Sequence, residues 1–124
     1  MNTKTINFQI LALLGDAIFS LYIREELLKI GINNPKKLQT KSIEYVSAKG
    51  QVKILNELTD KNFLTEEELD IVKRGRNYKR SIHPKNTDII TYKLSTGFEA
   101  LIGYLYLSKN TIRLEEILKN IEVK

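Results

Sequence analysis

The sequence predicts an all-α protein, one domain of six or seven helices over residues 1–124, and three observations lead to this prediction. Apolar residues recur at helical spacing through most of the chain. Almost no stretch shows the alternation of apolar and polar residues that is typical of a half-buried strand. Helix start and stop signals separate the apolar stretches. Apolar residues make up 42% of the chain and charged residues 28%, a composition that favours a folded domain over a disordered one.

The first half of the chain contains the signals of two or three helices. Helical periodicity runs from about residue 8 to 29 and stops before Gly31, a residue type that favours helix C-termini. The Asn-Pro pair at 34–35 has the pattern of an N-cap followed by proline at the first helical position. From about 40 to 61 apolar residues again fall at helical spacing, which predicts one long helix or two abutting helices with a break at Gly50.

The second half of the chain begins with a clear helix start. Thr65 and Glu68 have the spacing of a capping box, with acidic residues in the first turn. This helix should end near the RGR sequence at 74–76, and the segment from there to about residue 87 is the predicted loop, because it contains a glycine and a proline. A mostly apolar helix and a short amphipathic helix are expected at about 89–108 and 111–121.

Several function classes are excluded by what the sequence lacks. The chain has no cysteine, which excludes disulfides, thiolate metal sites and cysteine nucleophiles and suits a reducing compartment. The N-terminal residues lack the basic region and the cleavage pattern of a signal peptide. No apolar run approaches the ~18 residues of a membrane span. We therefore expect a cytoplasmic protein that is not embedded in a membrane.

Positive charge is concentrated in one segment. Lysine and arginine outnumber the acidic residues 20 to 15, and no acid occurs between residues 71 and 87. A polyanion or an anionic membrane could bind such a segment. A simpler interpretation is a solvated loop whose basic side chains complement the C-terminus of the preceding helix.

Two acidic residues stand alone on helices that are otherwise apolar. Between residues 8 and 23 the only residues that are neither apolar nor glycine are Gln9, Asp16 and Ser20, and their spacings of seven and four place them on one stripe. Residues 96–107 contain a single charge, Glu99. An ionised carboxylate on a buried helix is costly unless something compensates its charge. Both acids therefore require an explanation, and we expect both helices to be largely buried.

Two explanations remain open for these acids. If the helices pack with the two stripes facing each other, the carboxylates and water would form the oxygen-only site that Mg²⁺ accepts. Such a site can polarise a phosphoryl oxygen and activate water for attack. Alternatively, each acid is ion-paired with one of the many basic residues, and the role is structural.

The residues around the two acids form a recognisable pattern. LGDA at 14–17 and FEALIGYLYL at 98–107 resemble the two catalytic signatures of ribonuclease III domains. Three further blocks, YVSAKGQ at 45–51, RGRN at 74–77 and PKN at 84–86, make the chain most similar to the Mini-ribonuclease III subgroup, which consists of the catalytic domain alone. The five blocks occur in family order and span nearly the whole chain.

The chain departs from the larger ribonuclease III enzymes at two acidic positions. The family has four such positions, whereas this chain has Ala12 and Thr96 at two of them. This resembles the reduced pattern of the Mini subgroup. The chain ends with its last predicted helix, so we expect no double-stranded-RNA-binding domain.

The resemblance implies an endonuclease that cleaves double-stranded RNA as a homodimer with Mg²⁺, for which Mn²⁺ could substitute. The implied substrate is the base-paired stem of precursor 23S (large-subunit) ribosomal RNA, met within pre-ribosomal particles. Asp16 and Glu99 are the implied catalytic residues and metal ligands. Because A-form RNA is recognised mainly through phosphates and 2′-hydroxyls, we expect the basic segment to supply these contacts. The candidate RNA-binding residues are Arg74, Arg76, Asn77, Lys79, Arg80, Lys85 and Asn86.

Two other functions are compatible with parts of the sequence. A non-catalytic RNA-binding or ribosome-assembly protein could keep the fold without the chemistry. The two missing acids favour this alternative, whereas the presence of both Asp16 and Glu99 argues against it. A helical DNA-binding module is disfavoured because the sequence has no evident helix-turn-helix.

Overall fold

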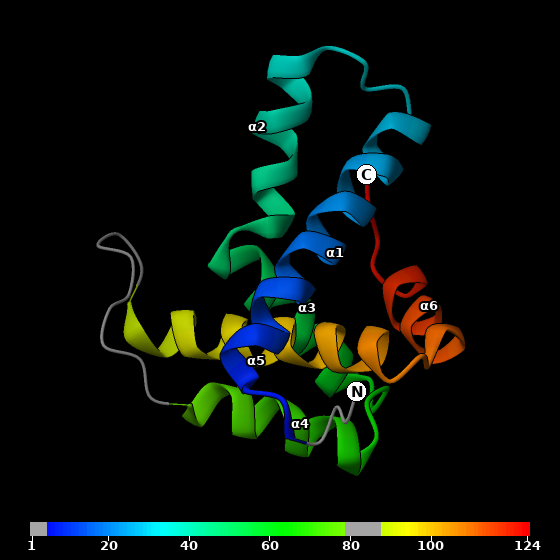
Figure 1. Ribbon diagram of the computed structural model, residues 1–124. Coiled ribbons are helices and arrows are strands. Elements are labelled where there is room, and N and C mark those ends of the chain that lie inside the picture. Colours follow the sequence, from blue (N-terminus) through cyan, green and yellow to red (C-terminus); the bar gives the residue numbers. More distant parts are fainter. Residues whose placement is uncertain (1–4, 79–87) are drawn as a thin grey trace.

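The computed structural model describes residues 5–78 and 88–124, and within these ranges the chain forms six helices and no strand (Figure 1). The helices are α1 (Phe8–Lys29), α2 (Pro35–Val46), α3 (Ala48–Asp60), α4 (Glu66–Asn77), α5 (Ile89–Leu107) and α6 (Thr111–Lys119). The all-α prediction is confirmed. The segment predicted as a loop, up to residue 87, falls mostly outside the described residues.

Side-chain caps define where most of these helices begin. The side chain preceding five of the six helices accepts a hydrogen bond from a backbone N–H of the first turn, and these residues are Asn7, Asn34, Ser47, Thr65 and Asp88. Thr65 and Glu68 form the complete reciprocal capping box, with hydrogen bonds of 3.1 and 2.9 Å. The predicted starts at Pro35 and after Thr65 are therefore confirmed.

The break between α2 and α3 lies at Ser47, so the prediction of a break at Gly50 is wrong. Ser47 is extended, and its hydroxyl accepts a hydrogen bond of 3.1 Å from the Gly50 N–H, which makes it the N-cap of α3. Gly50 lies inside the first turn of α3, where a side chain would overlap the carbonyl oxygens of Glu44 and Tyr45. The glycine permits the tight turn and does not interrupt the helix.

Helix α5 is the centre of the fold. α1 crosses it steeply, while α4 runs alongside it (Figure 1). Nine of its 19 residues are buried, including Phe98, whose ring packs edge-on against that of Phe19 in α1 at a centroid distance of 5.4 Å. The remaining helices complete the core around α1 and α5.

The first helix is not buried all round, contrary to the expectation from its sequence. Its inner face packs against α5, but a second apolar face is exposed in the single chain. The exposed side chains are Ile10 at 51%, Leu13 at 65%, Leu21 at 60% and Leu28 at 51%. In the described part of the chain, no helix combines the length and apolar character that crossing a membrane requires.

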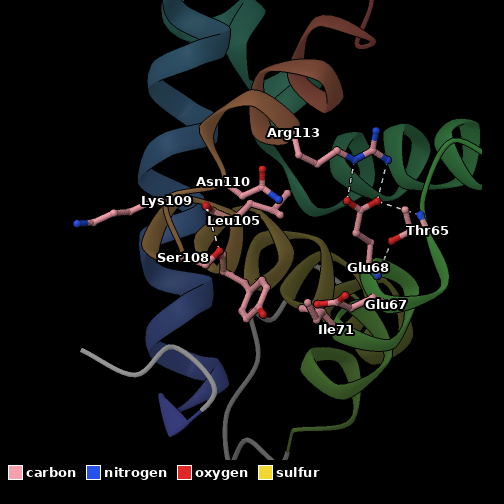
Figure 2. Close-up of a pocket in the computed structure, with 10 residues that line it drawn as sticks. Thr65, Glu67, Glu68, Ile71, Leu105, Ser108, Lys109, Asn110 and Arg113 are labelled. Atoms are coloured by element: carbon pink, nitrogen blue, oxygen red, sulfur yellow. Dashed lines mark hydrogen bonds and ion pairs between the residues drawn. The ribbon is translucent and has the colours of Figure 1, made fainter.

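An ion pair fastens α6 to the start of α4 (Figure 2). The guanidinium of Arg113 donates two hydrogen bonds, of 2.7 and 2.8 Å, to the carboxylate of Glu68 and a third, of 2.6 Å, to the carbonyl of Phe63. The guanidinium also lies over the Phe63 ring, 4.7 Å from its centroid. Burial alone would raise the pKa of Glu68, but the hydrogen bonds from Arg113 and Thr65 and the charge of Arg113 together hold that pKa below its usual value.

This ion pair should govern part of the acid stability of the fold. Because the pKa of Glu68 is lower in the folded state than in the unfolded state, its contribution is present above the unfolded value of about 4.3 and is lost as pH falls through the folded value. We expect Glu68→Gln to reduce the free energy of unfolding by about 2–3 kcal/mol at pH 7. Chemical denaturation between pH 7 and 3 should show this difference shrinking as the parent is acidified.

Glu116→Gln provides the matched control, because Glu116 accepts from the same guanidinium at 3.3 Å but is mostly exposed. This change should cost less than about 1 kcal/mol, as is usual for exposed ion pairs. A Glu68→Gln deficit that stayed the same at pH 3 and pH 7 would show that the charge of Glu68 is not the stabilising factor.

Candidate active site

The two predicted acids lie at the crossing of α1 and α5, where glycines bring the helix backbones into contact. A side chain on Gly15 in α1 would overlap the backbone carbonyl of Glu99 in α5. Reciprocally, a side chain on Gly103 in α5 would overlap the backbone carbonyl of Leu11 in α1. Asp16 follows Gly15 directly, so this crossing brings the two acidic signatures of the sequence together.

Asp16 is exposed, which corrects the expectation that it is a buried charge. Consecutive residues of a helix are turned by roughly 100°, so a helix that directs Gly15 at α5 turns Asp16 toward the edge of the contact. Asp16 forms no ion pair with any residue of the described ranges. A structural ion pair within these ranges therefore does not account for its presence.

Glu99 is half-buried and is held by a residue from a third helix. The Nε2 group of Gln51 in α3 donates a hydrogen bond of 3.0 Å to Oε2 of Glu99. The neighbouring polar residues of α5 behave differently, because the hydroxyls of Ser95 and Thr96 both donate to the carbonyl of Tyr92 in their own helix. Glu99 thus belongs to a contact between helices, whereas its two polar neighbours are satisfied locally.

The donor set at this crossing fits a hard divalent cation that retains much of its water. The crossing carries two acids, Asp16 and Glu99, and the described residues contain no cluster of three or more His, Cys, Asp or Glu that could hold a metal. Mg²⁺ is commonly held by one or two carboxylates, with water or substrate phosphate completing its shell. Asp16, which solvent reaches, and Glu99 would be the protein ligands.

Two of the candidate RNA-binding arginines, Arg74 and Arg76, lie at the C-terminal end of α4, beside the part of α5 that contains Gly97. α4 approaches α5 closely here, because a side chain on Gly97 would overlap the Val72 carbonyl of α4. Arg74 is exposed, and its guanidinium lies 5.0 Å from the ring centroid of Phe8 in α1. Arg76 is half-buried and donates a hydrogen bond of 3.2 Å to the side chain of Asn77.

The position of these arginines is consistent with both interpretations of the basic segment. Arg74 and Arg76 occupy the last turn of α4, where positive charge complements the helix dipole. Tyr78 is half-buried, and its hydroxyl accepts a hydrogen bond of 2.7 Å from Asn7, so it is packed against the start of α1. The other candidate RNA-binding residues, Lys79, Arg80, Lys85 and Asn86, lie outside the described residues.

Sequence reasoning did not assign a role to Gln51. It is 1% exposed and lies on the buried stripe of α3 with Ile54, Leu55 and Leu58. The sequence did contain a signal for Gln51. It precedes three apolar core residues by three, four and seven positions, and an apolar residue is expected at such a position of a helix. The apolar residue next to it, Val52, is only half-buried.

A pocket of about 630 Å³ between α4, α5 and α6 lies apart from this crossing (Figure 2). Its lining includes Glu68 and Arg113, whose polar atoms are engaged in the ion pair described above. Neither Asp16 nor Glu99 lines it. The crossing of α1 and α5 therefore remains the candidate active site.

Comparisons with known proteins agree with this fold and with these signatures. Residues 9–110 match the Ribonuclease III domain family. The chain is 43% identical over 117 residues to the Mini-ribonuclease 3 of Streptococcus pneumoniae, which covers 94% of this chain and 91% of that protein. It is 49% identical over 110 residues to the Mini-ribonuclease 3 of Brevibacillus brevis, covering 89% and 81% of the two chains.

A solved structure shows the same architecture. The crystal structure of a protein from Fusobacterium nucleatum, 36% identical in sequence, aligns with a TM-score of 0.78 over 93% of this chain and 90% of that chain. With the family match over most of its length, the chain belongs to the ribonuclease III family of endoribonucleases that act on double-stranded RNA, in the subgroup of the Mini-ribonuclease 3 proteins.

Proposed function

We propose that Asp16 and Glu99 form the catalytic centre of this endoribonuclease and that both bind a divalent cation, Mg²⁺ or Mn²⁺ in its place. The observation that carries the proposal is the glycine-mediated crossing of α1 and α5, which sets the backbone of Glu99 against Gly15, the residue before Asp16, although the two acids are 83 positions apart in the sequence. Family membership supports the reaction class, the hydrolysis of a phosphodiester bond in double-stranded RNA.

The protein residues contribute charge and position. A divalent cation, when bound, supplies Lewis-acid activation of the scissile phosphate and of water. Asp16 provides a carboxylate at the surface, where the phosphate of a rigid duplex can reach it. Glu99 provides a second carboxylate that is fixed by packing and by the hydrogen bond from Gln51. The rigid helix crossing keeps both acids in place before the substrate binds, which favours catalysis by positioning.

We assign duplex binding to the end of α4 and the segment that follows it. Arg74 is exposed, and Arg76 and Asn77 accompany it in the last turn, beside the stretch of α5 that leads to Glu99. Lys79, Arg80, Lys85 and Asn86 follow in the sequence, and we propose that they also contact phosphates. Phosphate contacts are independent of base sequence and suit recognition of A-form RNA by its shape.

The proposed physiological substrate is the base-paired stem of precursor 23S ribosomal RNA, cleaved in the cytoplasm within pre-ribosomal particles. The support for this substrate is the similarity to the Mini-ribonuclease 3 proteins, together with the five sequence blocks that resemble that subgroup. Residues 1–124 would act as one catalytic domain, with binding and cleavage both assigned to it and no double-stranded-RNA-binding domain required.

We further propose that the enzyme is a homodimer that pairs through the exposed face of α1. This face presents Ile10, Leu13, Leu21 and Leu28, which are all at least half exposed in the single chain. Contiguous apolar surface of this kind marks interaction sites. A two-fold pair would also present two active sites to a duplex, one for each strand, and two-fold symmetry is the commonest arrangement of homodimers.

The Asp16→Asn protein should fold normally, bind duplex RNA and fail to cleave it. Because Asp16 is exposed and unpaired among the described residues, the change should alter the free energy of unfolding by less than about 0.5 kcal/mol. Cleavage of a labelled perfect duplex in Mg²⁺ should fall on the order of a thousandfold, and adding Glu99→Gln should cost little more, since groups acting as a unit are non-additive. Asp60→Asn, at an exposed aspartate of α3, is the control.

The same assay separates the enzyme from a non-catalytic RNA-binding protein of this fold. A parent protein that binds the duplex but leaves it intact with Mg²⁺ and with Mn²⁺ would support the non-catalytic alternative. An Asp16→Asn protein that cleaves as fast as the parent would refute the catalytic assignment.

Replacing Arg74 or Arg76 by alanine should weaken duplex binding for every sequence to a similar extent. Each lost phosphate contact should also reduce the slope of log affinity against log salt by about one unit. For Arg74 we expect a loss of stability of about 0.5–1 kcal/mol as well, because its contact with the Phe8 ring is removed. Binding isotherms at three salt concentrations and thermal melts measure the two effects.

Lys29→Ala is the matched control for these arginines, since Lys29 is also an exposed basic residue in the last turn of its helix. The Lys29→Ala change should leave the slope of log affinity against log salt unchanged. If Arg74→Ala and Arg76→Ala also left the slope unchanged while lowering stability, the arginines would serve only the helix terminus.

Leu13→Glu should disrupt the proposed dimer without disrupting the fold. The Leu13 side chain is 65% exposed, so a charged residue is tolerated in the single chain, whereas it would be desolvated in an apolar interface. We expect the dissociation constant to rise at least tenfold in sedimentation equilibrium. Ile112→Glu on α6, at a side chain that is 77% exposed, should have no such effect. A parent chain that sediments as a monomer at micromolar concentration would exclude the dimer.

A further inference from the structure

Gln51 is a buried amide that connects three helices at the candidate active site. It lies in α3, is 1% exposed, and its Nε2 group donates both of its hydrogens. One hydrogen bond, of 3.0 Å, goes to the Val46 carbonyl at the end of α2, and the other, also of 3.0 Å, goes to Oε2 of Glu99 in α5. A single side chain therefore links the position of Glu99 to the junction of α2 and α3.

The orientation of this amide is fixed by its partners. Rotating the amide by 180° would place Oε1 of Gln51 against the Val46 carbonyl and the Glu99 carboxylate, which would bring acceptors together with no hydrogen between them. In the observed orientation Oε1 is buried and has no hydrogen-bond partner among the described residues. Such an orphaned acceptor typically costs about 1–3 kcal/mol.

Stability of the core does not explain why a glutamine occupies this position. An apolar side chain of the same size would continue the stripe of Ile54, Leu55 and Leu58 and would remove the unpaired Oε1, and what it would give up is the donor to the Val46 carbonyl and to Glu99. The buried Ser42 of α2 offers a contrast, because its hydroxyl bonds to the Gln39 carbonyl in its own helix at 2.8 Å. The Gln51 amide instead reaches out of its helix to the Glu99 carboxylate, and a buried group left unsatisfied in this way calls for an explanation.

We propose that Gln51 is the positioning residue for the Glu99 carboxylate. It holds Oε2 by a hydrogen bond from a rigid, buried support, so the carboxylate is oriented before cation and substrate bind. This inference rests on the proposed function, in which Glu99 is a metal ligand. Partners that orient metal ligands typically change metal affinity or activity by about 10–100-fold when they are removed.

Gln51→Met tests the proposal, because methionine has a similar length and volume but cannot donate to Glu99. Titration with Mg²⁺ or Mn²⁺ alone, followed by calorimetry or by the metal-induced rise in melting temperature, should show about 10–100-fold weaker binding. With duplex RNA, kcat should fall by a similar factor while KM stays within about twofold. Gln39→Met, at an exposed glutamine of α2, is the control and should match the parent.

A second measurement uses the parent side chain directly, so the proposal can be tested even if Gln51→Met folds poorly. Nuclear magnetic resonance resolves the two Nε2 hydrogens of Gln51 separately. In Glu99→Ala, the hydrogen bonded to Glu99 should lose its protection from exchange, whereas the one bonded to Val46 should keep it. In the parent, addition of Mg²⁺ should shift the first signal more than the second.

The outcomes distinguish this proposal from the proposed function. If the parent binds metal in a manner that Asp16→Asn weakens, but a folded Gln51→Met binds it equally well, the positioning role is wrong and the active site stands. If Gln51→Met weakens metal binding as much in a Glu99→Gln background as in the parent, its effect does not pass through Glu99 and the proposal is also wrong. If the parent binds no metal that depends on Asp16, the proposed function fails and this inference fails with it.

Discussion

The backbone contact between α1 and α5 is the interaction on which the candidate active site depends. Gly15 and Gly103 let the two helices approach until backbone meets backbone, and no other residue could occupy these positions without separating them. The same helix is approached from another side by α4, where Gly97 faces the Val72 carbonyl. Helix α5 therefore contacts both the helix that carries Asp16 and the helix that carries the arginines, so it fixes the position of one relative to the other.

Stability and site geometry are provided by different parts of the fold. The Glu68–Arg113 ion pair fastens α4 to α6 at a position that borders neither acid (Figure 2). Phe19 and Phe98 pack edge-on in the core that α1 and α5 share, and Phe98 is the residue before Glu99. Gln51 departs from this division, because it occupies a core position in α3 and its side chain donates a hydrogen bond to Glu99 at the candidate active site.

Most helix boundaries could be predicted from local signals, and the interhelical contacts could not. The caps at Asn34 and Thr65 act within a few residues of sequence, so their patterns sufficed. The break at Ser47 was missed because Gly50 is the more conspicuous residue, although its role is to permit close packing. The burial of Asp16 was overestimated because its helix has two apolar faces, and periodicity alone does not reveal that one of them stays exposed in the single chain.

The sequence left open whether the helices that carry Asp16 and Glu99 face each other, and the structure shows that their backbones meet at Gly15 and Glu99. The hydrogen bond that supports Glu99 could not be predicted. The hydrogen bond between Gln51 and Glu99 joins residues 48 positions apart and depends on how three helices pack together. The spacing of residues within one helix does not predict how three helices pack together. The arginines at the end of α4 became candidates through their charge and the RGRN block, and the structure adds the contact of Arg74 with the Phe8 ring and the close approach of α4 to α5.

The glycine crossing also affects how sequence variation in this chain should be interpreted. Gly15 and Gly103 carry no functional group, yet any larger residue at either position would displace Glu99 or Leu11 and the acids with them. Their intolerance to replacement would therefore look like that of a catalytic residue in any survey of natural or laboratory variants. A position of this fold that accepts no substitution can therefore be required for helix packing or for catalysis. The residue type distinguishes the two cases, because glycine has no side chain that could take part in the reaction.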